Sequence, residues 1–194
     1  MSGVGARAGW AVRSARLTLA VVAAALLVAA CGGSGGSSGA GKVDAVVYAG
    51  AMCKALTPFE RDIYRLRDAL DPPQAEAAAE HKAALQQFVT TVGADVREVK
   101  SKLKAAGTPD ITGGATFATA LVALFGKLES ELHAASAQID ALPTDSGPAY
   151  AQAVTPIVTQ LRTAIGNLGD GLDRVTNSAL EAAARKAPAC VAID

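Results

Sequence analysis

Apolar side chains recur at intervals of three and four residues along four blocks of the chain. The blocks run from Ala49 to Leu70, from Leu85 to Leu103, from Phe117 to Leu142 and from Tyr150 to Ala179. This spacing places the apolar side chains on one face of an α-helix, and no block alternates with the period of two that a strand requires. Short turns between four amphipathic helices predict an all-α fold, a four-helix up-down bundle with antiparallel neighbours.

Proline and glycine mark the expected ends of these helices. Asp71-Pro72-Pro73 ends the first helix and offers an N-cap to the second, and Gly107-Thr108-Pro109 closes the second. Pro143 ends the third helix and Pro188 ends the fourth. These positions predict short connections between the four helices.

Two of the blocks contain internal signals that weaken a helix. In the first, Thr57-Pro58-Phe59-Glu60 has the form of a capping box with proline at the first helical position. The first helix is therefore either two pieces, 43–56 and 58–70, or one helix kinked at Pro58. In the fourth block, Pro156 and the cluster of Gly166, Gly169 and Gly171 are expected weak points.

A different kind of segment precedes the four blocks. From Leu17 to Ala30 only Thr18 is polar, and the residues before this run carry Arg7, Arg13 and Arg16 and no acid. The run is shorter than the roughly 20 apolar residues of a transmembrane helix and suits the core of a signal peptide. Because Arg13 and Arg16 are not adjacent, there is no twin-arginine pair, and general secretion is the expected route.

The apolar run ends at Val28-Ala29-Ala30-Cys31, which resembles the lipobox of bacterial lipoproteins. The resemblance implies that diacylglycerol is attached to the Cys31 thiol and that the peptide bond before Cys31 is then cut. It places the protein on the extracytoplasmic face of the cell membrane, held by its lipid. The alternative is an uncleaved anchor in which Cys31 is palmitoylated or inert.

Three parts of the chain follow from this resemblance: a lipoprotein signal peptide over residues 1–30, the lipidated Cys31 with a Gly/Ser linker over residues 31–42, and a helical bundle domain over residues 43–194. The glycine and serine residues of the linker, residues 32–41, behave as a flexible coil with an r.m.s. span of about 17 Å. The linker is a spacer and not a phosphate-binding loop, since no Gly-Lys-Ser/Thr follows it.

With Cys31 assigned to the lipid, Cys53 and Cys190 remain as an even pair in an exported protein. Exported proteins encounter oxidising conditions, so a Cys53–Cys190 disulfide is expected. The alternative is a pair of buried free thiols.

Charge and composition exclude some partners. Without the leader the chain has 15 basic and 18 acidic residues, a net charge of about −3, which gives no electrostatic footprint for nucleic acid. It also lacks the polybasic cluster that adds attraction to anionic lipid. Trp10 is lost with the leader, and the seven remaining Phe and Tyr residues offer few platforms for stacking sugars or bases.

Two histidines are the candidate metal ligands. His81 has Glu76 and Glu80 nearby, and His133 follows Glu129 at i+4. Di-iron bundles use Glu-x-x-His, which neither histidine has, so no metal is expected and both histidines are expected at a helix end or a solvated face. Asp170 opens a segment that resembles a calcium loop but lacks its oxygen ligands and central glycine. No cofactor is expected other than the covalent diacylglycerol.

Motifs for catalysis are absent from the sequence as well. There is no Gly-x-Ser-x-Gly, and the two cysteines outside the lipobox are expected to be oxidised. The basic residues Arg97, Lys100, Lys102 and Lys104 complement the dipole at the end of the second helix. The chain is therefore not expected to be an enzyme.

The sequence after the leader resembles small alanine-rich lipoproteins and secreted proteins of high-GC Gram-positive bacteria. Ala51-Met52-Cys53-Lys54-Ala55-Leu56 and Pro188-Ala189-Cys190 carry this resemblance, which implies no activity. Two functions remain: a non-catalytic module that binds an envelope protein or cell-wall component, and a carrier of a small apolar ligand in the bundle interior. A continuous cavity favours the carrier, and a packed interior with an exposed apolar patch favours the module.

Overall fold

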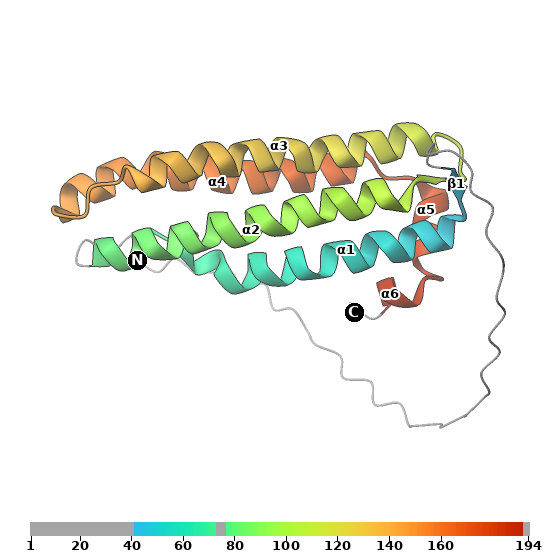
Figure 1. Cartoon of the computed structure of the whole chain (residues 1–194), viewed down its shortest axis with the longest axis horizontal. Helices are drawn as coiled ribbons and strands as arrows, with labels where there is room; N and C mark the ends of the chain where they lie inside the picture. The colour runs from blue at the N-terminus through green and yellow to red at the C-terminus, as the bar shows by residue number, and fades with distance from the viewer. Residues whose placement is uncertain (1–40, 73–76, 192–194) are drawn as a thin grey trace, which may run out of the picture. The chain divides into compact units, whose positions relative to one another are not determined.

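The computed structural model describes residues 41–72 and 77–191, and these residues are predominantly α-helical (Figure 1). The all-α prediction is therefore confirmed. The expected signal peptide, Cys31 and almost all of the expected linker lie outside the described residues. The four long helices are α1 (Ala45–Leu66), α2 (Ala78–Ala106), α3 (Gly114–Asp140) and α4 (Gly147–Arg174), and two short helices follow, α5 (Ser178–Ala184) and α6 (Pro188–Val191).

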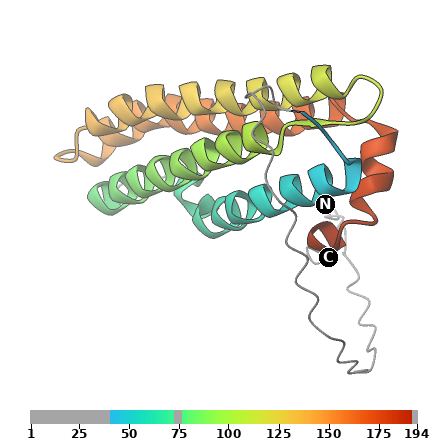
Figure 2. The same cartoon turned by 45° about the vertical axis from the view of Figure 1, so that its right-hand side comes forward.

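Each long helix packs against the next one in the chain: α1 against α2, α2 against α3, and α3 against α4. Figures 1 and 2 show that successive long helices run in opposite directions. A 3₁₀ helix, η1 (Arg67–Leu70), follows α1. The two short C-terminal helices, α5 and α6, pack on α1. The beginning of α1 and the end of the described chain therefore lie side by side.

Apolar side chains from all four long helices form one core. Among the largest fully buried side chains are Leu85, Phe88, Phe125 and Leu161. The ring of Phe125 on α3 meets the ring of Phe59 on α1 edge to face, with centroids 5.6 Å apart. A second cluster joins Tyr48 and Ala49 of α1 to Leu180, Ala183 and Ala187 of the C-terminal segment. The spacing of three and four residues seen in the sequence is thus the spacing of the buried face.

The first helix is continuous through Pro58, so the structure has one helix here and not two pieces. Asp44 caps its beginning, because one carboxylate oxygen accepts from the amides of Val46 at 2.9 Å and Val47 at 3.2 Å. The Thr57 hydroxyl donates to the Cys53 carbonyl at 2.9 Å, one turn back, and does not cap a new helix. Pro58 removes one backbone donor, and the burial of Phe59 beside it favours the continuous helix.

The expected N-cap at Asp71 is also wrong. Helix α2 begins at Ala78, and its N-cap residue Ala77 makes no side-chain bond to the helix. Asp71 instead follows η1, where its carboxylate lies 3.5 Å from a guanidinium nitrogen of Arg162 on α4. The same guanidinium donates to the Leu70 carbonyl, so contacts with α4 hold Asp71 and the residue before it.

The sequence predicted that the fourth helix ends at Pro188, and this prediction is wrong: α4 ends at Arg174. The Val175 amide donates to the carbonyls of Gly171 and Leu172 at 3.2 Å, which closes α4. Asn177 then caps α5, since its side-chain oxygen accepts from the amides of Ala179 and Leu180. The apolar spacing continues across this break, which explains why the sequence did not reveal it.

Two strands of two residues each, β1 (Lys42–Val43) and β2 (Thr108–Pro109), pair in parallel at the start of α1. The sequence predicted no strand, because two residues are too few to show an alternating pattern. Lys42 and Asp110 add an ion pair at 3.0 Å between exposed side chains beside these strands. The strands tie the residues just before α1 to the connection between α2 and α3.

Candidate functional site

A groove of about 510 Å³ runs between α3 and α4. Its apolar floor comes from Leu124 and Leu128 on α3 and from Ala164 and Leu168 on α4. Leu128, Ala164 and Leu168 are buried residues of the core, so the groove lies at the edge of the core. The remaining lining residues are Lys127, Glu131, Pro156, Thr159, Gln160, Thr163, Asn167 and Arg174.

One glycine sets how closely α4 approaches α3 beside this groove. A Cβ atom built on Gly171 would lie 2.4 Å from Cδ2 of Leu124, a distance that real Cβ atoms do not adopt. Gly166 and Gly169 have open space at the same position. Gly171 therefore permits a close helix–helix contact, a role that the sequence did not indicate.

We expect Gly171→Ala to lower the free energy of unfolding by about 1–3 kcal/mol, because the new methyl group must displace Leu124. Gly169→Ala is the matched control, and it should raise stability by about 0.5–1 kcal/mol since alanine is the better helix former. Urea unfolding of both variants measures the difference. Equal stabilisation by the two substitutions would contradict the close contact.

The rim of the groove is polar and carries separated charges. The Gln160 amide donates to a carboxylate oxygen of Glu131 at 2.9 Å, which joins α4 to α3 near one end of the groove. Arg174 lies near the other end, and Lys127 lies one turn from Glu131 along α3. Within the described part of the chain, neither Lys127 nor Arg174 has a carboxylate within 4.0 Å. The groove thus offers an apolar floor beside two cations without acidic partners.

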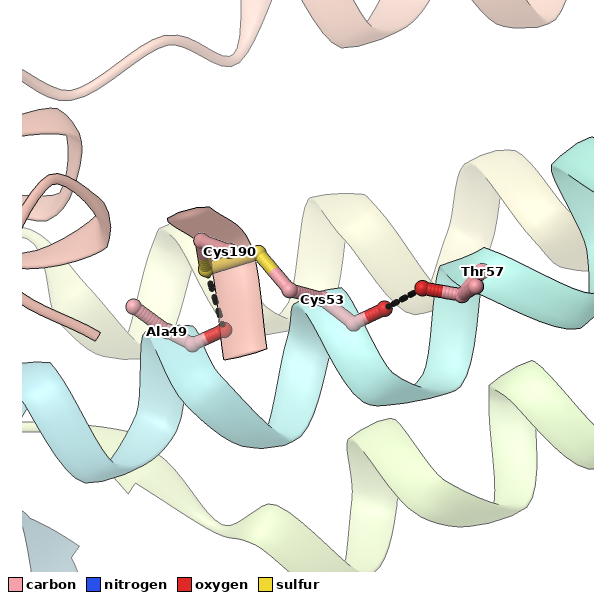
Figure 3. Close-up of a disulfide and its surroundings, with 4 residues drawn as sticks. All are labelled: Ala49, Cys53, Thr57 and Cys190. Atoms are coloured by element: carbon pink, nitrogen blue, oxygen red, sulfur yellow. Dashed lines mark hydrogen bonds between the residues drawn. A yellow bond between two sulfur atoms is a disulfide. The ribbon is translucent and has the colours of Figure 1, made fainter. Parts of the chain in front are cut away.

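Cys53 and Cys190 form a disulfide in the structure, the pairing expected from the sequence (Figure 3). Their Cα atoms are 5.2 Å apart, and the bond closes 137 residues of chain. The Cys190 sulfur also lies 3.4 Å from the Ala49 carbonyl oxygen, a contact without a proton because a disulfide sulfur carries none. The disulfide holds α6 on the first turns of α1. Cys31, the expected lipidation site, lies outside the described residues.

The two histidines lie on different helices and do not converge. Nδ1 of His81 on α2 is 2.6 Å from the hydroxyl of Tyr150 on α4, and the two rings are perpendicular with centroids 5.8 Å apart. Burial raises the pKa of Tyr150 to about 12, so its hydroxyl stays protonated at neutral pH. His133 is exposed on α3. Among residues 41–72 and 77–191, no three His, Cys, Asp or Glu side chains gather as a metal site would require.

Two of the basic residues at the end of α2, Lys100 and Lys102, form ion pairs. Lys100 pairs with Glu129 of α3, and its hydrogen bond lowers the pKa of that carboxyl. Lys102 pairs with Glu98 one turn back on α2, at 2.7 Å. Arg97 and Lys104 are exposed. The α2–α3 contact therefore includes an ion pair that spacing along α2 alone did not indicate.

Two carboxylates with shifted pKa values, the buried Asp62 on α1 and the half-buried Asp95 on α2, were missed in the sequence. Asp62 is 7 % exposed, and hydrogen bonds from Arg61 at 3.1 Å and Arg65 at 3.3 Å lower its pKa. Asp95 has one carboxylate oxygen that is buried without a hydrogen-bond partner among the described residues. Burial, then the charges of Asp62 and Glu98, raise the pKa of Asp95. The available signal was the position of Asp62 three residues after Phe59, on the apolar stripe of α1.

Asp95→Asn should make the protein more stable at neutral pH and less sensitive to pH. Because the folded-state pKa of Asp95 is raised, its carboxylate costs stability above that pKa, and the cost disappears on acidification below the unfolded-state pKa. Asparagine resembles the protonated acid, so the variant and the parent should converge near pH 3. Melting temperatures from pH 3 to pH 8 measure this. Superimposable curves would show that Asp95 titrates normally.

No protein-family model, no curated protein and no solved structure matches the chain. Among the helices of the described residues, none has both the length and the hydrophobicity needed to cross a membrane. The features of the chain that bear on function are therefore the groove, the disulfide and the sequence around Cys31.

Proposed function

We propose that this protein is a lipid-anchored, extracytoplasmic binding module without catalytic activity. Residues 43–194 form a four-helix up-down bundle, diacylglycerol on Cys31 holds it at the cell membrane, and the groove between α3 and α4 contacts an envelope protein or cell-wall component. The observation that carries the proposal is the apolar floor of this groove, formed by Leu124, Leu128, Ala164 and Leu168 beneath a polar rim. An apolar centre with a polar rim is the usual anatomy of a binding surface.

The packing of the interior supports a binding module over a carrier. Phe88, Leu121, Phe125 and Leu161 are each at most 1 % exposed, and one cluster of buried side chains includes residues of all four long helices. Side chains therefore occupy the space in which a carrier would hold its apolar ligand. The accessible apolar surface lies instead at the edge of the core, in the groove.

The anchor proposal rests on the lipobox resemblance and predicts the effect of Cys31→Ser. The variant should move from the membrane fraction to the soluble fraction, because removal of the thiol removes both acyl chains of diacylglycerol. Stable anchoring needs two such chains, since a single acyl chain binds only marginally. Fractionation of cells and immunoblotting measure this. Retention of the Cys31→Ser variant in the membrane would contradict the proposed anchor.

The binding proposal is tested by photocrosslinking in intact cells. A photoreactive amino acid at Thr163, on the rim of the groove, should give a discrete adduct. The same amino acid at Ala94, exposed on α2 and away from the groove, is the control and should give none. No adduct from position 163, or equal adducts from both positions, would contradict the groove as the contact surface.

A further inference from the structure

We infer that the occupant of the groove is an amphipathic α-helix of a partner protein that places carboxylates opposite Lys127 and Arg174 and a cation opposite Glu131. The inference rests on the proposed function and names the partner of the same surface. It depends on the shape of the groove and on the arrangement of its charges.

The shape suits a helix. The groove lies between two antiparallel helices. Its lining extends from Pro156 to Arg174 on α4, about 27 Å at 1.5 Å per residue, and from Leu124 to Glu131 on α3, about 10 Å. Amphipathic helices bind in this way, with their apolar face laid into an apolar groove. A small ligand instead needs a site that buries 70–90 % or more of its surface. The lining residues Thr159, Thr163 and Asn167 are exposed to solvent, so this groove is open along its α4 side.

The charges specify what the helix must carry. Neither Lys127 nor Arg174 has a carboxylate of the described residues within 4.0 Å, so an apolar surface over either cation would remove its water without supplying a partner. Such a burial is costly unless the charge is paired. Glu131 accepts one hydrogen bond from Gln160, but no cation of the described residues lies within 4.0 Å of it. A partner with two carboxylates and one cation satisfies all three positions.

The helical rise gives the order and spacing of these charges. Lys127 lies four residues from Glu131 on α3, about 6 Å along the groove. Arg174 lies fourteen residues beyond Gln160, the hydrogen-bond partner of Glu131, and so about 21 Å from that end. The complementary helix therefore carries a cation, an acid about one turn away, and a second acid about four turns away.

Synthetic helices of 18 residues with one leucine face test the inference. Two charge patterns are compared, a matched and a reversed one. Each pattern is made twice, once running from the N-terminus to the C-terminus and once in the opposite order. The matched peptide carries Lys, Glu and Glu at the three positions, and the reversed peptide carries Glu, Lys and Lys. Compensating charges on the opposite face keep the net charges equal. Fluorescence anisotropy measures their affinities for the mature chain, residues 31–194, with Cys31→Ser.

We expect the matched peptide to bind at least tenfold more tightly than the reversed peptide in one of the two directions. The double variant Lys127→Glu/Arg174→Glu should invert this preference. Its control is Lys54→Glu/Arg185→Glu, which changes the same charge at two exposed residues outside the groove and should leave the preference unaltered. Circular dichroism melting verifies that both double variants are folded.

Four results would overturn the inference. They are the absence of peptide binding, equal binding of the two peptides, a preference that the groove variant does not alter, and concentration-dependent dimers of the chain that the groove variant abolishes. The last result would identify a second copy of the chain as the occupant. If the adduct from position 163 persists when the peptides fail, the binding function stands and only the partner chemistry is wrong.

Discussion

Replacing both Cys53 and Cys190 with serine is expected to remove several kcal/mol from the free energy of unfolding. The disulfide closes 137 residues, and the chain-entropy model assigns on the order of 5 kcal/mol to a loop of that length. Residual structure in the unfolded chain reduces this figure, so it is an upper value. The C-terminal segment depends on the bond most, because α6 has only four residues and cannot persist as an isolated helix.

Urea unfolding compares this double variant with the parent, both carrying Cys31→Ser so that residue 31 offers no third thiol. Hydrogen exchange should show that residues 178–191 lose protection first, since these residues pack on α1 beside the bond. Reduction of the parent should reproduce the effect and serves as the control for the substitutions. Two free thiols in the folded, unreduced protein would reject the bond, and an unchanged unfolding curve would reject its structural role.

Phe125→Ala is expected to lower the free energy of unfolding by about 3–5 kcal/mol. Phe125 is 0 % exposed and meets Phe59 edge to face, so truncation removes contacts between α3 and α1 and leaves a cavity. The loss depends on whether neighbouring side chains can collapse into the space. A rigid, filled interior predicts a loss at the upper end of this range.

Phe125→Leu is the matched control, because it keeps most of the apolar volume and should cost less than half as much. Urea unfolding of the two variants and the parent provides the comparison. A loss below about 1 kcal/mol for Phe125→Ala would mean that the ring was not closely packed. That result would contradict the filled interior and favour a carrier with space for an apolar ligand.

The sequence predicted the existence of the four long helices better than their ends. Apolar residues recur every three or four positions along a buried helix face, and this spacing does not depend on how the helix ends. The helices could therefore be recognised from residues such as Leu85 and Phe88. Their ends depend on tertiary contacts: Arg162 engages Asp71, and Asn177 begins a new helix where the apolar spacing continues. Pro58 is tolerated inside α1, beside the buried side chain of Phe59.

The candidate site was not predictable from the chain alone. Lys127 and Arg174 are ordinary surface charges in the sequence, and only the packing of α3 against α4 places both beside one apolar floor. Gly171 looked like a weak point because a sequence does not show the Leu124 side chain opposite it. The Cys53–Cys190 pairing was predictable because only two cysteines remain once Cys31 is assigned to the lipid.

The mass of the N-terminal peptide, isolated from the membrane fraction, tests most directly whether a lipid on Cys31 holds the protein at the membrane. We expect a peptide that begins at Cys31 and carries the added mass of diacylglycerol. A peptide that contains the intact Ala30–Cys31 bond, or one that begins at an unmodified Cys31, would contradict it.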